Sequence, residues 1–161
     1  MKRFALIVAM LLAIPAAGHA DSALVTYKSI APDTALELAE AALKKCRADG
    51  YQVAVIVLDR FGAPLVGLRD RYASLGAWDI ATGKAWTAIN FGRDTSVLIK
   101  DGNITPALAR APRVMLSAGG VIIEAAGSII GGVGVAGAPG GDKDEACAKA
   151  GLDAVRDKLD F

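Results

Sequence analysis

Residues Gly119–Gly151 read GGVIIEAAGSIIGGVGVAGAPGGDKDEACAKAG, and this stretch decides what kind of sheet the chain builds. Two apolar segments, Val121–Ile123 and Ile129–Val135, are separated by a turn of small residues, which predicts a β-hairpin. The second segment holds three glycines, although glycine weakens a strand because it costs backbone entropy. We therefore expect something to lie close against this strand: a packed helix as the simplest case, another subunit, or a ligand.

The glycines of this segment also match the spacing of a dinucleotide-binding fingerprint, Gly132-x-Gly134-x-x-Gly137. That fingerprint follows a strand and opens a helix. Here the glycines lie within an apolar strand, and Pro139 intervenes before any helix starts. We reject nucleotide binding by this motif.

The first 20 residues have the layout of a secretory signal peptide. Lys2 and Arg3 precede an apolar run, Phe4–Ile14, that is too short to span a bilayer, and small residues surround Ala20. The alternative, a short membrane anchor, lacks a basic stop-transfer flank. We expect a signal peptide over residues 1–20, a leader over residues 21–33 and one domain over residues 34–161. The protein would be periplasmic or secreted, with no membrane segment after cleavage.

Composition excludes several classes of function. The mature chain has no basic patch interleaved with aromatic residues, so we expect no nucleic-acid partner. Cleavage removes His19, the only histidine, so Ser/His and Cys/His catalytic triads cannot be built and we assign no catalytic residue. Two cysteines without a histidine also fall short of the four ligands of a structural zinc site, and we assign no metal site.

The two cysteines, Cys46 and Cys147, belong to a chain that we expect to reach an oxidising compartment. A cysteine pair there most often forms a disulfide, and only one intramolecular connectivity is open to it. Closing a loop of about a hundred residues would stabilise the fold by ~4.7 kcal/mol in the chain-entropy model. Two separate buried thiols are the alternative.

Periodicity and turn residues predict an α+β fold with a single domain and a central, mainly antiparallel sheet flanked by helices. The expected elements, in chain order, are a helix over 33–49, a hairpin of strands 52–59 and 65–69, a helix over 72–91, a short helix over 94–100, a strand over 113–117, the glycine-rich hairpin, and a helix over 144–159.

Four pieces of the chain occur in a recognisable order. They are the helix end Cys46–Tyr51 (CRADGY), the strand and turn Val55–Gly62, Lys84–Ala88 (KAWTA) with Phe91-Gly92, and the closing hairpin through Asp144–Gly151. Together they resemble the GlcG/HbpS-type haem-binding family, which is related to the carboxy-terminal domain of certain corrinoid adenosyltransferases. The resemblance covers about residues 34–160.

The resemblance implies a profilin-like fold, assembly into a homo-oligomer (a dimer or an octamer), and haem as the cofactor. Two departures bear on the ligand. The family often has Gly-Val-Ser-Gly where this chain has Ala136 in place of the serine, and the mature chain lacks histidine, the usual axial ligand of haem iron. The remaining candidates for axial ligation are Met115, Tyr51, Tyr72, Lys84, a cysteine and Thr95.

We expect Lys84 and Thr87 to carry the ligand site. They lie three residues apart on one side of a helix, so they can present an ammonium and a hydroxyl to a haem propionate or another small carboxylate. A solvated lysine beside a core-edge threonine is the alternative. Tyr72, Thr95 and Met115 complete the set of candidate ligand-binding residues.

Three functions remain open at this stage. The first is an exported protein that binds haem or a similar carboxylated small molecule between subunits. The second is an enzyme that degrades haem or uses it in a redox step. The third is an accessory protein of a periplasmic oxidation system that binds a partner protein without haem.

Overall fold

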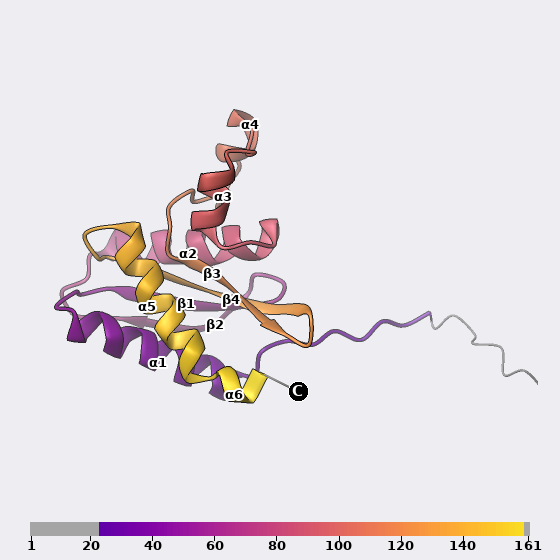
Figure 1. Ribbon diagram of the computed structural model, residues 1–161, viewed down its shortest axis with the longest axis horizontal. Helices are drawn as coiled ribbons and strands as arrows, with labels where there is room; N and C mark the ends of the chain where they lie inside the picture. Colours follow the sequence, from indigo (N-terminus) through magenta and orange to yellow (C-terminus); the bar gives the residue numbers. More distant parts are fainter. Residues whose placement is uncertain (1–22, 160–161) are drawn as a thin grey trace, which may run out of the picture.

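The computed structural model describes residues 23–159 and forms three layers, with helices on both faces of one sheet (Figure 1). None of the helices in this part of the chain has the length and apolar composition needed to cross a membrane. The elements are α1 (Pro32–Ala48), β1 (Ala54–Asp59), β2 (Pro64–Arg69), α2 (Leu75–Phe91), α3 (Thr95–Asp101), α4 (Pro106–Ala109), β3 (Gly120–Ala125), β4 (Ser128–Ala136), α5 (Gly141–Ala154) and α6 (Arg156–Leu159).

The sheet has the strand order β2-β1-β4-β3, and every neighbouring pair is antiparallel. The predicted α+β fold with an antiparallel sheet is therefore confirmed. Strands β1 and β4 occupy the centre and are almost wholly buried, which agrees with their nearly continuous apolar sequence. Strand β3 is an edge strand, and it forms the predicted glycine-rich hairpin with β4.

The larger core lies between the sheet and the pair α1 and α5. Leu38 of α1, Val55 of β1 and Val133 of β4 are among its fully buried side chains. Cys46 and Cys147 join α1 to α5 through a disulfide whose Cα atoms lie 5.5 Å apart. Both cysteines are buried, so the bridge is internal to this core and the predicted pairing is confirmed.

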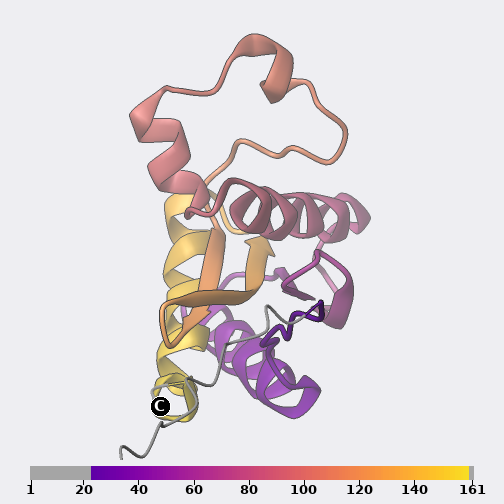
Figure 2. The ribbon, with the colours of Figure 1, turned by 90° about the vertical axis from the view of Figure 1, so that its right-hand side faces the viewer.

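Helix α2 alone covers the other face of the sheet, and the glycines of β3 and β4 allow its backbone to come very close (Figure 2). A Cβ added to Gly134 would lie 1.9 Å from the carbonyl oxygen of Ala81, and one added to Gly120 would lie 2.3 Å from that of Lys84. The packed helix was the simplest of the expected reasons for these glycines, and it is confirmed at Gly134.

Two expected elements differ from the structure. Residues 113–117 form no strand, because they cross the outer face of α2, where the Met115 N–H donates to the Thr87 hydroxyl at 2.8 Å. The last helix is not continuous over 144–159. It begins earlier, at Gly141, and breaks at Val155 before α6.

Residues 95–118, which we call the arm, leave the domain between α2 and β3 (Figures 1 and 2). The arm is held at its base, where the Thr95 hydroxyl accepts the Gly120 N–H at 2.9 Å and the Thr87 hydroxyl accepts the Met115 N–H. Helix α4, near the tip, contributes no buried residue. Helix α3 was predicted from the sequence, whereas α4 was not.

The contact of α2 with β4 generates the first prediction. Gly134→Ala should destabilise the protein by about 1–3 kcal/mol, the usual cost of overpacking, because the new methyl group meets backbone atoms. Urea unfolding measures the change in the free energy of unfolding. Gly76→Ala is the matched control, since an added Cβ there meets nothing within 4 Å. It should leave the stability unchanged or raise it by up to about 1 kcal/mol. Equal stability of both variants would contradict the close contact.

Candidate functional site

Lys84 lies at the centre of a buried polar network rather than at the surface. Its side chain is 2% exposed, and its Nζ donates to Asp144 Oδ2 at 2.7 Å and to the Val135 carbonyl at 3.0 Å. Asp144 Oδ1 in turn accepts the Ala138 N–H at 3.0 Å. The network therefore joins α2, the end of β4 and the start of α5. Burial raises the pKa of Asp144, and the bond from Lys84 opposes that shift.

Thr87, Thr95 and Met115 are also engaged within the chain. The Thr87 hydroxyl donates to the Gly83 carbonyl at 2.7 Å while it accepts from Met115. The Thr95 hydroxyl holds the edge of β3 at Gly120. Met115 is half-buried beside Gly83. The structure thus brings Lys84, Thr87 and Met115 to the same part of α2, with Thr95 at the nearby base of the arm.

These contacts change how the expected Lys84 and Thr87 pair is understood. The alternative of a solvated lysine is wrong, because the ammonium is buried against a carboxylate. A direct contact of either side chain with a ligand stays a prediction. Sequence reasoning missed Asp144 as the partner, because it follows Lys84 by 60 residues and no local pattern links the two. A lysine in an otherwise apolar helix was the available signal that a buried partner was required.

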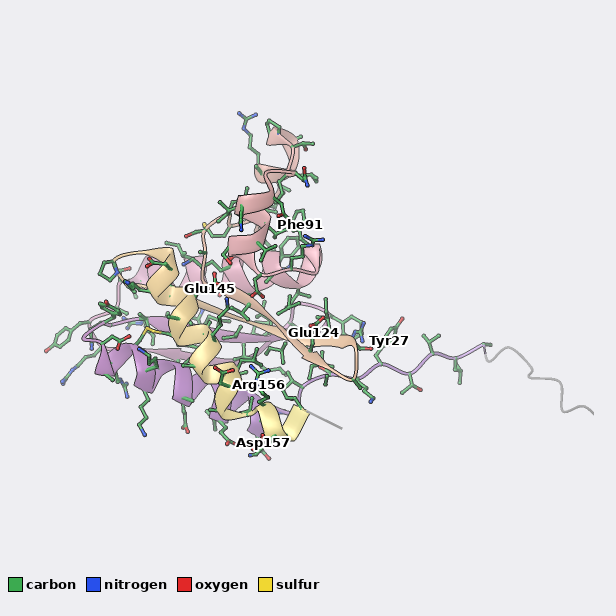
Figure 3. All side chains as sticks on the ribbon, in the orientation of Figure 1. Tyr27, Phe91, Glu124, Glu145, Arg156 and Asp157 are labelled. Atoms are coloured by element: carbon green, nitrogen blue, oxygen red, sulfur yellow. A yellow bond between two sulfur atoms is a disulfide. The ribbon has the colours of Figure 1, made fainter. Side chains whose placement is uncertain are left out.

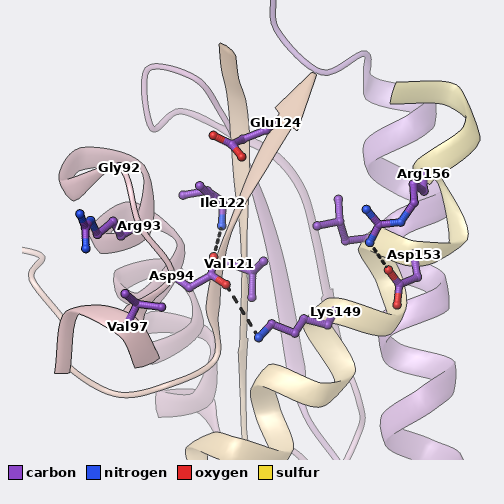
Figure 4. A pocket seen from close by; sticks show the side chains of 11 residues that line it. Gly92, Arg93, Asp94, Val97, Val121, Ile122, Glu124, Lys149, Asp153 and Arg156 are labelled. Atoms are coloured by element: carbon purple, nitrogen blue, oxygen red, sulfur yellow. Dashed lines mark hydrogen bonds and ion pairs between the residues drawn. The ribbon is translucent and has the colours of Figure 1, made fainter. Parts of the chain in front are cut away.

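A cleft lies at the free edge of the sheet, between β3, α5 and the junction of α2 with α3 (Figure 4). It has a volume of about 480 Å³. Asp94 Oδ1 accepts the Ile122 N–H at 3.0 Å, and Lys149 Nζ lies 3.9 Å from Asp94 Oδ2. Burial raises the pKa of Asp94. The lining residues are Gly92, Arg93, Asp94, Val97, Val121, Ile122, Glu124, Lys149, Leu152, Asp153 and Arg156.

This edge cleft combines three basic and three acidic side chains, so it has no net charge preference. Its lining contains no histidine, cysteine, methionine or tyrosine, the side chains that usually ligate haem iron. Asp94 and Thr95 also occupy the outward-facing amides of β3, which protects the sheet edge. The cleft therefore does not fit a ligated haem.

Exposed aromatic and apolar side chains lie at the start of α2, and we call Tyr72, Leu75 and Trp78 the α2 face. Tyr72 and Leu75 are 75% and 79% exposed. The Arg71 guanidinium lies 5.1 Å from the centre of the Tyr72 ring. Trp78 packs over Gly67 of β2, where an added Cβ would come within 2.2 Å of the indole, and still remains partly exposed. Figure 3 shows the side chains of the whole domain.

Few side chains in the described part of the chain can ligate haem iron. Residues 23–159 contain no histidine, and both cysteines are oxidised. No cluster of three His, Cys, Asp or Glu side chains within residues 23–159 could hold a metal ion. Of the remaining candidates, Met115 and Tyr51 are half-buried, and Tyr27 stacks edge-on against Phe61. Tyr72 is the most exposed of these candidates, and the Arg71 guanidinium lies beside its ring.

A comparison with protein families identifies the chain. Residues 30–153 match the family described as haem degrading protein HbpS-like. The chain belongs to the HbpS-like family. The resemblance found in the sequence is thereby confirmed, and the match spans most of the described domain.

Solved structures agree with this membership. A crystal structure of HbpS shares 37% identity, with a TM-score of 0.79, and covers 83% of this chain and 94% of its own. A double mutant of Streptomyces reticuli HbpS shares 35% identity, with a TM-score of 0.78, over 92% of this chain and 98% of its own. The PduOC:heme complex shares 25% identity, with a TM-score of 0.71, over 78% and 94%. No curated protein matches the sequence.

The buried network generates the second prediction. Lys84→Met should destabilise the protein by about 3–5 kcal/mol, because it leaves Asp144 buried without its cation. The pKa of Asp144 in the folded variant would rise further above its unfolded value. The loss of stability caused by Lys84→Met should therefore be present above the pKa of Asp144 in the folded variant, and it should be relieved as the pH falls through that pKa. Urea unfolding at several pH values measures this.

The double variant Lys84→Met/Asp144→Leu is the control. It removes both charges, so it should recover most of the stability and lose this pH dependence. A single variant as stable as the wild type at neutral pH would contradict the network.

Proposed function

We propose that this protein is an exported haem-binding protein and that haem lies on the α2 face. Family membership and the likeness to a PduOC:heme complex are the observations that support haem as the ligand. The location of the haem site on the α2 face is supported by Tyr72, because this face offers an exposed iron-ligating side chain together with exposed apolar ones. The proposal keeps the expected homo-oligomer, a dimer or an octamer.

Export rests on the sequence of residues 1–20, which lie outside the described residues. The proposed order is a signal peptide over residues 1–20, a leader over 21–33 and the haem-binding domain over 34–161. An internal disulfide between Cys46 and Cys147 agrees with a periplasmic or secreted protein, because such bonds persist in oxidising compartments.

The residues at and beside the α2 face would have the following tasks. The Tyr72 phenol would ligate the iron, and the Arg71 guanidinium beside it would pair with a propionate. Leu75 and Trp78 would contact the apolar part of the macrocycle. Bound haem would supply a redox-active iron. Lys84, Thr87, Thr95 and Met115, which the sequence predicts as ligand-binding residues, would in this proposal fix α2 and the arm through the bonds described above instead of contacting haem themselves.

Haem titration tests this proposal. Adding hemin to the wild type should give a saturable Soret shift. Tyr72→Phe should weaken binding at least about tenfold and change the ligand-to-iron absorption, since it removes the ligating oxygen. Tyr27→Phe is the matched control, because Tyr27 is also exposed but lies in the leader. Wild-type binding that is unaffected by Tyr72→Phe would exclude the α2 face as the ligating site.

Haem degradation is a second candidate, favoured by the description of the family. It predicts that the bound haem loses its Soret band faster than free hemin when a reductant and oxygen, or peroxide, are added. The rate is followed by absorbance, with Tyr72→Phe alongside. Equal rates for the protein-bound and free hemin would remove the enzymatic function and leave haem binding alone.

A further inference from the structure

The charges that line the edge cleft are balanced in number but not in pairing. Arg93 pairs with Asp101, which lies outside the cleft, and Arg156 pairs with an acid of the lining. The third base, Lys149, bonds to Glu145 one helical turn earlier, and that carboxylate is not part of the lining. Each base of the cleft therefore has a carboxylate partner already.

This pairing leaves carboxylates at the cleft short of cations. Lys149 Nζ lies 3.9 Å from Asp94 Oδ2, beyond hydrogen-bond distance, while it donates to Glu145 Oε1. The side chain of Glu145 is 10% exposed, and its Oε2 is buried with no hydrogen-bond partner among the described residues. Glu124 is exposed, and no ion pair joins it to another described residue. This part of the molecule therefore offers acceptors that no donor of the chain satisfies.

The free edge of β3 adds a backbone acceptor at the same place. Ile122 directs its N–H outward to Asp94 Oδ1. The N–H and C=O of a residue in an antiparallel strand lie on the same side, so the Ile122 carbonyl also faces the free edge. Figure 4 shows Asp94 between Glu124 and Lys149, with Ile122 beside it. Two carboxylates and a carbonyl thus line this side of the cleft, and an ammonium group has three donors to offer them.

The cleft also has an apolar part, formed by Val97, Val121 and Leu152. A bare metal ion does not suit it, because no cluster of three His, Cys, Asp or Glu side chains within residues 23–159 could hold one. An organic cation suits both parts, since its charged end meets the acceptors and its body meets the apolar side chains.

We propose that the edge cleft is a binding site for a small primary amine with an apolar body. The ammonium group donates to Asp94 Oδ2, to the Ile122 carbonyl and to the Glu124 carboxylate. The body of the ligand packs on the three apolar side chains of the cleft. This site shares no residue with the α2 face, so the inference goes beyond the proposed function and does not rest on it.

Titration of the mature protein with phenethylamine, followed by NMR of the backbone amides, tests the proposal. Saturable shifts with a dissociation constant below about 1 mM are expected. They should concentrate on residues 92–97, 121–124 and 149–153, which line the cleft. Hydrocinnamate, in which a carboxylate replaces the ammonium group, is the matched control ligand and should bind at least about tenfold more weakly.

Two variants test the acceptors. Asp94→Asn keeps an oxygen for the Ile122 N–H but removes the charge, and it should weaken phenethylamine binding at least about tenfold. Glu124→Gln changes an exposed side chain, so it should fold and weaken binding by about two- to fivefold. Glu40→Gln is the matched control, because Glu40 is an exposed glutamate of α1 that does not line the cleft, and it should leave binding unchanged.

Three results would each overturn the inference: no saturable binding of phenethylamine, equal binding of hydrocinnamate, or wild-type affinity in both Asp94→Asn and Glu124→Gln. Shifts confined to residues 71–78 would place the amine at the α2 face and would also overturn it. A protein that binds phenethylamine at the edge cleft but binds no hemin would leave this site standing and overturn the proposed function.

Discussion

The close approach of α2 to the sheet is the constraint on which the rest of this structure depends. Side chains between a helix and a sheet normally hold the two backbones apart. Gly120 and Gly134 have no side chain, and the residues of α2 that face the sheet are mostly alanines. The helix backbone therefore rests directly on β3 and β4. A lysine in the middle of that helix cannot reach solvent, so Lys84 turns along the sheet and pairs with Asp144.

This constraint also explains where function can be located. The inner side of α2 has no space for a ligand, because the helix backbone lies directly against β4 at Gly134 and the Ile89 side chain fills the space at Gly132. The polar groups around its centre are already engaged by Asp144, Thr87 and the arm. What remains available is the start of the helix, where Tyr72 and Leu75 are exposed, and the sheet edge, where Asp94 and Lys149 line a cleft of balanced charge.

Much of the fold could be predicted from local patterns. The hairpin of β3 and β4, the extent of α1 and the pairing of Cys46 with Cys147 each depend on a few nearby residues or on a single possible partner. The errors lie where a local pattern competes with a distant contact. Residues 113–117 are suited to a strand, yet the Met115 amide donates to the Thr87 hydroxyl on α2 instead of to a neighbouring strand.

The sequence by itself determined the family, the antiparallel sheet and the small-residue face against which a helix had to pack, because strand alternation, turn residues and missing side chains are properties of short segments. Only the tertiary structure decided that Lys84 is an internal ion-pair partner and that Tyr72 is exposed. Asp144 follows Lys84 by 60 residues, and the burial of either group depends on packing that no single segment specifies.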